Sequence, residues 1–361
     1  MVERPTSTLH RLTLRAERAL DQVRPDWGTD YERLTIVPYT SHGNRDRMVL
    51  RGRVLANRPL GPATRVEHVH RRVNRMVRRF LTKEVPDVTL QVEAGAATAI
   101  TTTDDEGYWR VEIEGHDLPA DRSFHHVTVT PVDHRDVPVH ESPARVVVPT
   151  TKAARLVVTD IDDTIMQSDA FDRVRLYRRT VTGSAWTRQA FAGTGTLFAG
   201  LQRGPALDED NPVAYLSSSA WNLYDFHVAF LRRSAMPDGP LFLRDMGLDE
   251  QRFFGGSHES HKRLHLDELL EVHDLPMVLV GDTGQRDAEI YRDVVADNPG
   301  RVEAVLLRQV ADDRRLREVE AMYADLDVPL VVSPHTTAWA AACEELGLIA
   351  PGWTERVAAS G

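Results

Sequence analysis

The sequence contains a single cysteine, Cys343, and its aromatic residues make up only 7% of 361 residues. One cysteine excludes an internal disulfide and a zinc site built from several cysteines, and it is compatible with a reducing compartment. No apolar run approaches the roughly 20 residues that a membrane-spanning helix needs, and residues 1–26 lack the apolar core of a signal peptide. We therefore expect a cytoplasmic protein without a transmembrane segment.

The chain also lacks an excess of positive charge. Its formal net charge of -10 at pH 7 argues against a general nucleic-acid-binding protein, whose binding surface is normally basic. Hydrophobic residues make up 42% and charged residues 27%, which is typical of an ordinary soluble globular protein. The length suffices for two domains with separate cores. Internal repeats and low-complexity tracts are absent.

One segment departs from this acidic balance. Apolar residues recur at three- and four-residue intervals from Val66 to Leu81, which predicts an amphipathic helix over about residues 64–83. Its opposite face is basic, and the arginines that could dock on an anionic surface are Arg71, Arg72, Arg75, Arg78 and Arg79. The apolar face could pack on a neighbouring sheet and leave the basic face in solvent, or the basic face could dock on an anionic membrane, and both can hold at once.

Short strands are predicted throughout the first part of the chain. Alternating apolar and polar residues, separated by Gly, Pro and Asp clusters, predict strands at residues 34–38, 48–55, 88–92, 97–102, 108–113, 127–132 and 145–148. This spacing is typical of an antiparallel sandwich. We expect residues 1–150 to form a mainly β, sandwich-like accessory domain that carries the basic helix.

Strands alternate with helices after residue 151. Apolar runs predict strands at residues 156–159, 213–216, 241–244, 277–280, 302–307 and 330–333. This βα alternation favours an α/β catalytic domain with a doubly wound parallel sheet over residues 151–349, followed by a loose tail at 350–361. Residues 165–211 are the only insertion large enough for a cap. A small cap favours a bulky or surface-bound substrate.

Two aspartates follow the first strand of this domain. Asp160 and Asp162 lie two residues apart behind the apolar run 156–158, so an extended chain points both side chains to one face. One carboxylate can attack phosphorus while the other moves a proton, and Thr164 adds a hydroxyl. Asp-rich strand ends also occur as ordinary turns and helix caps. The D-x-D-x-T pattern resembles the first motif of the haloacid-dehalogenase-type phosphohydrolases.

The partners that such chemistry needs follow in chain order. Ser217 ends the second strand and offers its hydroxyl and the backbone N–H groups behind it to a phosphoryl oxygen. Asp282 and Asp287 follow the predicted strand at 277–280, and their carboxylates are oxygen ligands of the kind Mg²⁺ prefers. Lys262 lies near the start of a helix predicted over residues 261–273, which brings its ammonium group to the same end of the sheet.

Six motifs between residues 157 and 308 resemble one family within that superfamily, the actin-patch-protein type of Mg²⁺-dependent phosphatidate phosphatase catalytic domain. They are T-D-I-D-D-T-I at 159–165, D-A-F-D-R-V-R-L-Y-R-R at 169–179, Y-L-S-S-S-A-W at 215–221, P-D-G-P-L-F-L-R-D at 237–245, H-K-R at 261–263 and G-D-T-G-Q-R-D-A-E-I-Y at 281–291. The last motif is the most specific. In the third, Ser218 and Ala220 replace an Asn and a Pro that are common in the family.

The resemblance implies a hydrolase that acts on phosphoric monoesters. Its expected reaction converts phosphatidate to diacylglycerol and phosphate through an aspartyl phosphate on Asp160. Asp162 would protonate the leaving alkoxide and then activate water as a base. The expected partner is phosphatidate at an anionic membrane surface, with the protein bound peripherally to the inner face of the membrane.

The same resemblance implies a Mg²⁺ cofactor. Its expected ligands are the carboxylate of Asp160, the backbone carbonyl of Asp162 and the carboxylate of Asp282, with Asp287 nearby. The phosphoryl group would be held by Ser217 and Lys262, and Thr164 would support the loop.

Other interpretations remain open on the sequence alone. The same chemistry could act on a soluble or macromolecular phosphomonoester, or the protein could be a non-catalytic lipid-binding or scaffolding protein. His258, His261 and His265 could form a metal-binding helix face, but the oxygen-rich site beside them favours exposed or supporting histidines. The remaining aromatic candidates, Trp221 and Trp339, are expected in the core.

Overall fold

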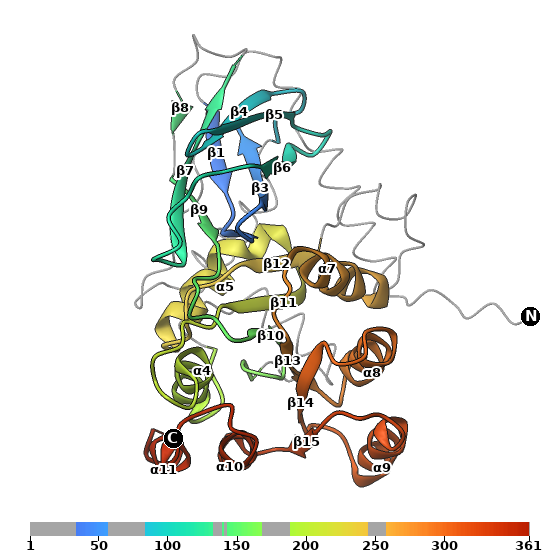
Figure 1. Cartoon of the computed structure of the whole chain (residues 1–361). Coiled ribbons are helices and arrows are strands. Elements are labelled where there is room, and N and C mark those ends of the chain that lie inside the picture. The colour runs from blue at the N-terminus through green and yellow to red at the C-terminus, as the bar shows by residue number, and fades with distance from the viewer. Residues whose placement is uncertain are drawn as a thin grey trace, which may run out of the picture.

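The computed structural model describes residues 34–56, 84–132, 139–140, 143–167, 188–244 and 258–360. These ranges form two parts, a β region up to residue 148 and an α/β domain from residue 154 onward. Figure 1 shows the β region stacked on one edge of the parallel sheet of the α/β domain. The predicted basic helix at about 64–83, with its five docking arginines, lies outside the described residues.

The β region is a nine-stranded, mainly antiparallel sheet. Its strands run in the order β5-β4-β7-β9-β2-β3-β1-β8, with β6 paired to β3. They are β1 (Leu34–Pro38), β2 (Ser41–Gly43), β3 (Arg47–Leu55), β4 (Thr89–Ala94), β5 (Ala97–Thr102), β6 (Tyr108–Glu114), β7 (Phe124–Pro131), β8 (Val139–His140) and β9 (Ala144–Val147). The seven strands predicted from the sequence are all present, which confirms a β-rich N-terminal part.

The two halves of this sheet enclose one core. Strand β7 pairs with β9 through its first residues, beginning at Phe124, and with β4 through its last, ending at Pro131. Buried apolar residues from both halves, such as Leu50 and Val92, belong to the same cluster. The sandwich expected from the sequence is thus a single sheet that folds over itself, because the eight-residue strand β7 is long enough to belong to both halves.

The α/β domain contains a six-stranded parallel sheet in the order β12-β11-β10-β13-β14-β15. Its strands are β10 (Leu156–Asp160), β11 (Val213–Ala220), β12 (Leu241–Arg244), β13 (Met277–Asp282), β14 (Val302–Arg308) and β15 (Leu330–Ser333). Later strands extend from β10 first toward β12 and then toward β15. The chain order therefore changes direction beside β10 and β13, which is where ligands bind in open α/β sheets.

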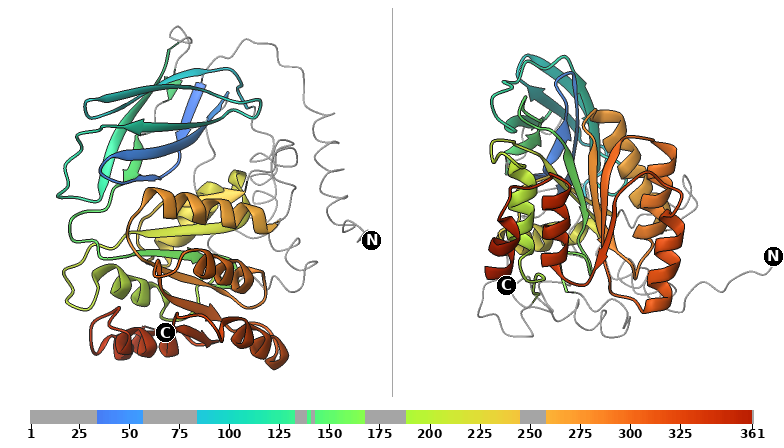
Figure 2. Two further views of the ribbon diagram at one scale, coloured as in Figure 1. Left: turned by 45° about the vertical axis from the view of Figure 1, so that its right-hand side comes forward. Right: turned by 60° about the horizontal axis from the view of Figure 1, so that its bottom comes forward.

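Helices cover both faces of this sheet, as Figure 2 shows. One face carries α4 (Thr194–Arg203), α5 (Tyr224–Arg233), α10 (Thr336–Glu345) and α11 (Trp353–Ala359). The other carries α7 (His258–Val272), α8 (Asp287–Asp297) and α9 (Asp313–Tyr323). Successive strand residues, such as Val157 and Val158, are buried on opposite faces. The parallel α/β sheet is thus confirmed, and its haloacid-dehalogenase-like assignment stays a prediction.

Two boundaries predicted from the sequence were wrong. Helix α4, placed in the cap, packs Leu197, Phe198 and Leu201 into the main core. The tail, expected to be loose, forms α11, whose Trp353 and Val357 are buried in the same core and whose indole donates a hydrogen bond to the carbonyl of Thr196. The remainder of the predicted cap, residues 168–187, lies outside the described residues.

Candidate active site

Three neighbouring strands deliver their carboxyl ends to one place. Strand β10 ends at Asp160, β13 ends at Asp282, and β11 carries Ser217 as the last residue of its buried run. Helix α7 adds Lys262 from the sheet face beside them. The structure therefore brings together side chains from distant parts of the chain, such as Asp160 and Lys262, which are 102 residues apart, as the sequence predicted.

A tight turn follows Asp160. The carbonyl of Ile161 accepts hydrogen bonds from the backbone N–H groups of both Ile165 and Met166, and Asp163 adopts a left-handed conformation with φ 61°. Aspartate tolerates this conformation better than most residues with a side chain. The turn ends the strand abruptly and keeps Asp162 beside the end of β11, where its carboxylate accepts a hydrogen bond from Ser217 at 2.9 Å.

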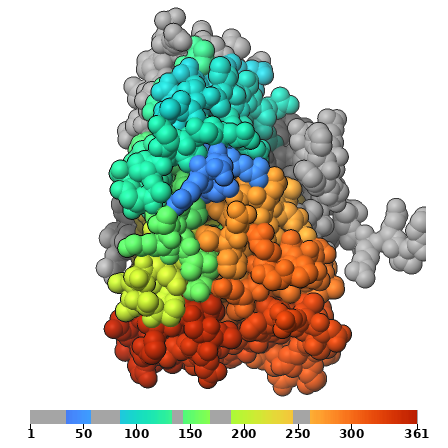
Figure 3. Space-filling model, viewed as in Figure 1, coloured from blue at the N-terminus to red at the C-terminus, as the bar shows by residue number. Residues whose placement is uncertain are grey.

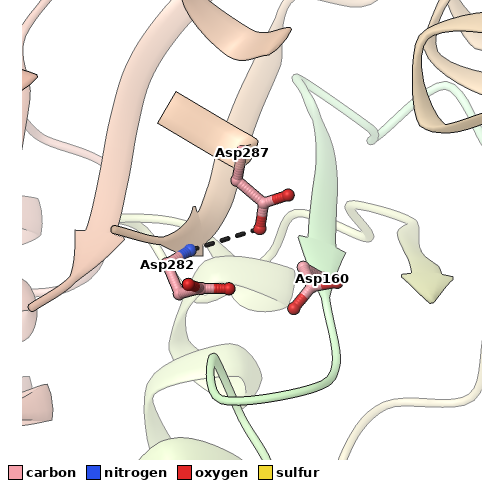
Figure 4. A group of neighbouring side chains, drawn as sticks. All are labelled: Asp160, Asp282 and Asp287. Carbon is pink, nitrogen blue, oxygen red and sulfur yellow. Dashed lines mark hydrogen bonds between the residues drawn. The ribbon is translucent and has the colours of Figure 1, made fainter. Parts of the chain in front are cut away.

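Three aspartates form a buried acidic cluster. One carboxylate oxygen from each of Asp160, Asp282 and Asp287 lies within 4.8 Å of the others (Figure 4). The Nζ atom of Lys262 lies 2.6 Å from Asp160 Oδ1 and also pairs with Asp287. One lysine thus faces three acids in a buried site.

The pKa values of these groups show the electrostatic cost of this arrangement. Burial raises the pKa of Asp160, Lys262 opposes this rise, and Asp287 and Asp282 add to it. Burial and the neighbouring Asp287 raise the pKa of Asp282 to about 7. Burial alone would lower the pKa of Lys262, but the charges of Asp160 and Asp287 outweigh it and raise the pKa.

The acidic cluster has the chemistry of a divalent-cation site. Asp160 Oδ2 is buried and accepts no hydrogen bond from the described residues, so it is free to bind a cation. Carboxylate oxygens are the ligands that Mg²⁺ prefers. Among the described residues, this is the only group of three or more acidic, histidine or cysteine side chains with ligand atoms close enough to share a metal ion.

A glycine allows the cluster to form. A Cβ atom at Gly281 would lie 2.8 Å from Cβ and Oδ2 of Asp287 and from the ring of Tyr291. The start of α8 therefore packs directly against the end of β13, and Asp287 Oδ2 accepts a hydrogen bond from the backbone N–H of Asp282.

Gln285 is a site residue that the sequence analysis did not single out. Its Nε2 donates to the backbone carbonyl of Asp162 and to Oδ2 of Asp282, both at 3.1 Å. It thereby links two of the groups predicted to bind metal. Arg315 fixes this loop through the carbonyl of Thr283 at 3.0 Å. The sequence signal that could have identified Gln285 was its place within the glycine-containing loop after β13.

If the acidic cluster binds the Mg²⁺ expected from the sequence, replacing Gln285 by alanine should raise the Mg²⁺ concentration needed for half-maximal activity about tenfold, because loss of a residue that orients metal ligands typically weakens metal affinity by this amount. Activity at saturating Mg²⁺ should change much less. The measurement is a Mg²⁺ titration of phosphate release, with Arg286→Ala at the neighbouring, half-exposed position as the control. An unchanged Mg²⁺ requirement in Gln285→Ala would exclude this role.

Ser217 and its neighbours form the other half of the site. The Ser217 hydroxyl is buried, donates to Asp162 Oδ2 and accepts a hydrogen bond from the backbone N–H of Ser219 at 3.1 Å. The predicted phosphoryl-binding serine therefore contacts the predicted proton carrier. This contact fixes the Asp162 carboxylate beside β11. The Asp162 carboxylate is thus held separately from Asp287, which pairs with Lys262.

Thr164 contributes through its backbone. Its carbonyl accepts a hydrogen bond from Arg308 Nε at 2.7 Å, whereas its buried hydroxyl has no hydrogen-bond partner among the described residues. The Arg308 guanidinium lies between the rings of Phe191 and Trp339, and burial lowers its pKa to about 9. The sequence analysis missed Arg308; its signal was its register beside Asp282 at the end of β14.

The remaining sequence expectations have mixed outcomes. Trp221 and Trp339 are buried in the core, as predicted. His261 and His265 are buried rather than exposed, with the His265 ring against those of His261 and Phe242, and neither belongs to the acidic cluster. The side chain of His258 lies outside the described residues.

A lysine and several buried carboxylates meet at the switch point of the parallel sheet, where open α/β sheets bind ligands and where a carboxylate can act as a nucleophile. A comparison with protein families adds to this description. Residues 155–309, somewhat less than half of the chain, match the family described as "Phosphatidate phosphatase APP1, catalytic domain".

Two curated proteins are similar to the chain. Over 251 residues it is 25% identical to "Phosphatidate phosphatase APP1" of Saccharomyces cerevisiae, which covers 65% of this chain and 40% of that protein. Over 158 residues it is 24% identical to "Uncharacterized protein C29B5.04c" of Schizosaccharomyces pombe, covering 44% of this chain and 25% of that protein. The chain thus spans less than half the length of either relative.

Among solved structures, a single-residue mutant of the PilB minor pilin from Streptococcus sanguinis covers 97% of this chain and is itself covered completely, at 8% identity. The TM-score of 0.29 is too low to bear on the fold.

Proposed function

We propose that the protein is a Mg²⁺-dependent phosphatidate phosphatase that hydrolyses phosphatidate to diacylglycerol and phosphate through an aspartyl phosphate, on a haloacid-dehalogenase-like domain. The observation that carries the proposal is the cluster of Asp160, Asp282 and Asp287 around Lys262. The family match of residues 155–309 supports phosphatidate as the substrate.

In the first step, the Asp160 carboxylate attacks phosphorus and the bond to the diacylglycerol oxygen breaks. Asp162 donates its proton to the departing alkoxide. In the second step, Asp162 accepts a proton from water, which attacks the aspartyl phosphate and releases inorganic phosphate. The hydrogen bond from Ser217 to Asp162 supports this assignment, because it orients the proton carrier beside the nucleophile.

The phosphoryl group needs positive charge and hydrogen-bond donors around its oxygens. Lys262 and Ser217 supply these from α7 and β11. Asp160, Asp282 and the carbonyl of Asp162 would hold Mg²⁺, with Asp287 beside them, and the bound ion would offset charge on the phosphoryl oxygens. The buried Asp160 Oδ2 accepts no hydrogen bond from the described residues, and the pKa of Asp282 is raised. Both features fit this assignment, because each favours a nearby cation.

The test is phosphate release from vesicles of phosphatidylcholine that contain phosphatidate, with and without Mg²⁺. A parallel panel of sugar phosphates, nucleotides and phosphopeptides separates the lipid substrate from a soluble or macromolecular phosphomonoester. Preferred hydrolysis of a panel member would replace phosphatidate as the substrate. Absence of Mg²⁺-dependent hydrolysis of every compound would favour a non-catalytic lipid-binding or scaffolding protein.

We further propose that the protein acts in the cytoplasm, where it binds the inner face of the membrane peripherally through the basic segment at about residues 64–83. None of the helices within the described ranges combines the length and hydropathy needed to cross a membrane. Each Lys or Arg near an anionic surface can contribute about 1 kcal/mol of binding. The arginines concerned are Arg71, Arg72, Arg75, Arg78 and Arg79.

Replacing these five arginines by glutamine is expected to weaken binding to vesicles that contain anionic lipid, while hydrolysis of a soluble chromogenic phosphate stays unchanged. Vesicle co-sedimentation at increasing salt measures the first effect, since screening weakens surface electrostatics. Equal binding of wild type and variant would contradict the docking role.

A further inference from the structure

The β region contacts particular elements of the α/β domain. Its hydrogen bonds and ion pairs among the described residues reach α7, the segment after β11, and the segments that precede β11 and β12. In Figure 3, the surface of β1–β3 (blue) adjoins that of α7 (orange). Lys262, assigned to the phosphoryl group, lies on the first of these elements, and Ser217 lies on β11, just before the second.

Glu268 is the centre of the contact with α7. It lies six residues after Lys262 on the helix and accepts a hydrogen bond from His42 Nε2 at 2.8 Å. Arg51 pairs with its other carboxylate oxygen, and Arg110 lies 3.4 Å from that same atom. The Glu268 side chain is only 14% exposed, so three strands of the β region converge on one largely buried carboxylate.

The end of the helix is bound as well. Asn44 Nδ2 donates to the carbonyl of Val272 at 2.7 Å, and Arg47 donates to both the carbonyl and the carboxylate of Glu271. His42 Nδ1 also lies 3.1 Å from His273 Nε2. The β region therefore fixes the C-terminal part of α7, from Glu268 onward, while Leu266 and Leu269 pack onto the sheet.

A second set of contacts fixes the segment after Ser217. Strand β11 ends at Ala220 and continues into a 3-10 turn, η1 (Trp221–Leu223). The ring of Tyr39 stacks on Trp221 with 4.2 Å between centroids, and Arg53 Nη1 donates to Asn222 Oδ1 at 2.5 Å. Arg53 is itself fixed by Glu84 at 2.6 Å.

We propose that the β region is a structural part of the catalytic unit that positions the phosphoryl-binding groups, with Glu268 and Asn222 as the positioning residues on the α/β side. The proposal rests on the proposed function. The metal-binding groups differ in this respect, because Asp160, Asp282 and Asp287 come from β10, β13 and α8 in the interior of the domain. Loosening the interface should therefore affect phosphate binding and leave the Mg²⁺ requirement in place.

The experiment compares full-length Glu268→Gln and Asn222→Ala with Asp238→Asn. The glutamine side chain would keep an acceptor for His42 and remove the charge that Arg51 and Arg110 share. The Asp238 variant breaks a different interdomain ion pair, with Arg145 at 3.1 Å, which touches neither α7 nor η1. Three quantities are measured: the affinity for inorganic phosphate, KM and kcat, and hydrogen exchange of the α7 amides.

For Glu268→Gln and Asn222→Ala we expect phosphate affinity to fall and KM to rise by about tenfold, the size of one lost hydrogen bond to a charged group. Activation by Mg²⁺ and kcat should stay near wild type. The α7 amides should exchange faster in Glu268→Gln, and Asp238→Asn should match wild type in every measurement.

Unchanged α7 exchange in Glu268→Gln would overturn the proposal, and so would equal losses in the Asp238 control. If the protein hydrolyses no phosphomonoester, the proposed function is refuted. Hydrogen exchange needs no turnover, so it still decides whether the β region fixes α7. A variant that loses Mg²⁺ activation together with phosphate affinity would show a general loss of structure, which contradicts a positioning role.

Discussion

Replacement of Asp160 by asparagine is expected to lower Mg²⁺-dependent phosphate release by at least about 10⁴-fold, the scale of losses measured when a nucleophile is removed. The amide cannot form the covalent intermediate, and it lacks the charge that pairs with Lys262 at 2.6 Å. A continuous phosphate-release assay on phosphatidate vesicles, extended to long times, measures the loss.

The matched control is Asp163→Asn, three residues further along the same loop. Asp163 has φ 61°, a conformation that asparagine adopts readily, and it is not one of the cluster carboxylates. We expect this control to retain most of the activity. If Asp160→Asn kept more than about one hundredth of wild-type activity, Asp160 would not be the nucleophile.

Asp160→Asn should also leave the protein folded, which separates a chemical effect from a structural one. Burial raises the pKa of Asp160, so its charged form is costly in the metal-free protein and a neutral side chain removes that cost. The thermal midpoint without Mg²⁺ is therefore expected to match or exceed that of wild type. Such an inverse relation between stability and activity is common at catalytic sites.

The parallel sheet could be predicted because each strand is a compact apolar run. Buried on both faces, β10 and β13 begin as continuous stretches of Leu, Val and Met, and the aspartate two residues after each run marks the carboxyl end. Since parallel strands present these ends at one edge, Asp160 and Asp282 could be expected at the same edge, and the strand order makes them neighbours. The candidate site residues could therefore be predicted from the order of the motifs along the sequence.

The supporting residues could not be found in this way. Arg308 is a single basic residue at the end of an apolar strand. Its guanidinium contacts the rings of Phe191, which lies far earlier in the sequence, and of Trp339, which lies on a later helix. Glu268 reads as an ordinary helix glutamate until His42 and Arg51 of the β region converge on it. Such contacts depend on how elements dock, and a local pattern does not contain that information.

The same limit explains the two wrong boundaries. Residues 194–203 lie between the first motif and the second strand of the sheet, where a cap would be inserted, and nothing local distinguishes a cap helix from one that packs on the sheet. Their core contacts include Trp353 and Val357, whose own helix at 353–359 is short and polar apart from these residues and its alanines. Each helix is stabilised by the other, so neither could be assigned from its own sequence.

Replacement of Asp282 by asparagine is expected to remove the stabilisation by Mg²⁺ and to lower activity by at least about 100-fold, because the proposed site loses one of its ligands. In wild type, Mg²⁺ should raise the thermal midpoint in a concentration-dependent manner, since a ligand that binds only the folded state stabilises it. Thermal melts over a Mg²⁺ series measure the first effect, and Asp163→Asn again serves as the control.

The metal-free proteins should differ in their response to pH. The pKa of Asp282 is raised from its ordinary 3.8 to about 7, so the unfolded chain loses its proton first as pH rises. The stability of wild type relative to Asp282→Asn should therefore fall between about pH 4 and pH 7 and level off above, by on the order of 2 to 4 kcal/mol. A constant difference across this range would mean that Asp282 is already charged when the metal is absent. Three buried acids around one lysine carry an unfavourable electrostatic free energy in the metal-free protein. Binding of the cation removes this cost, which explains why the folded domain keeps an arrangement that destabilises it.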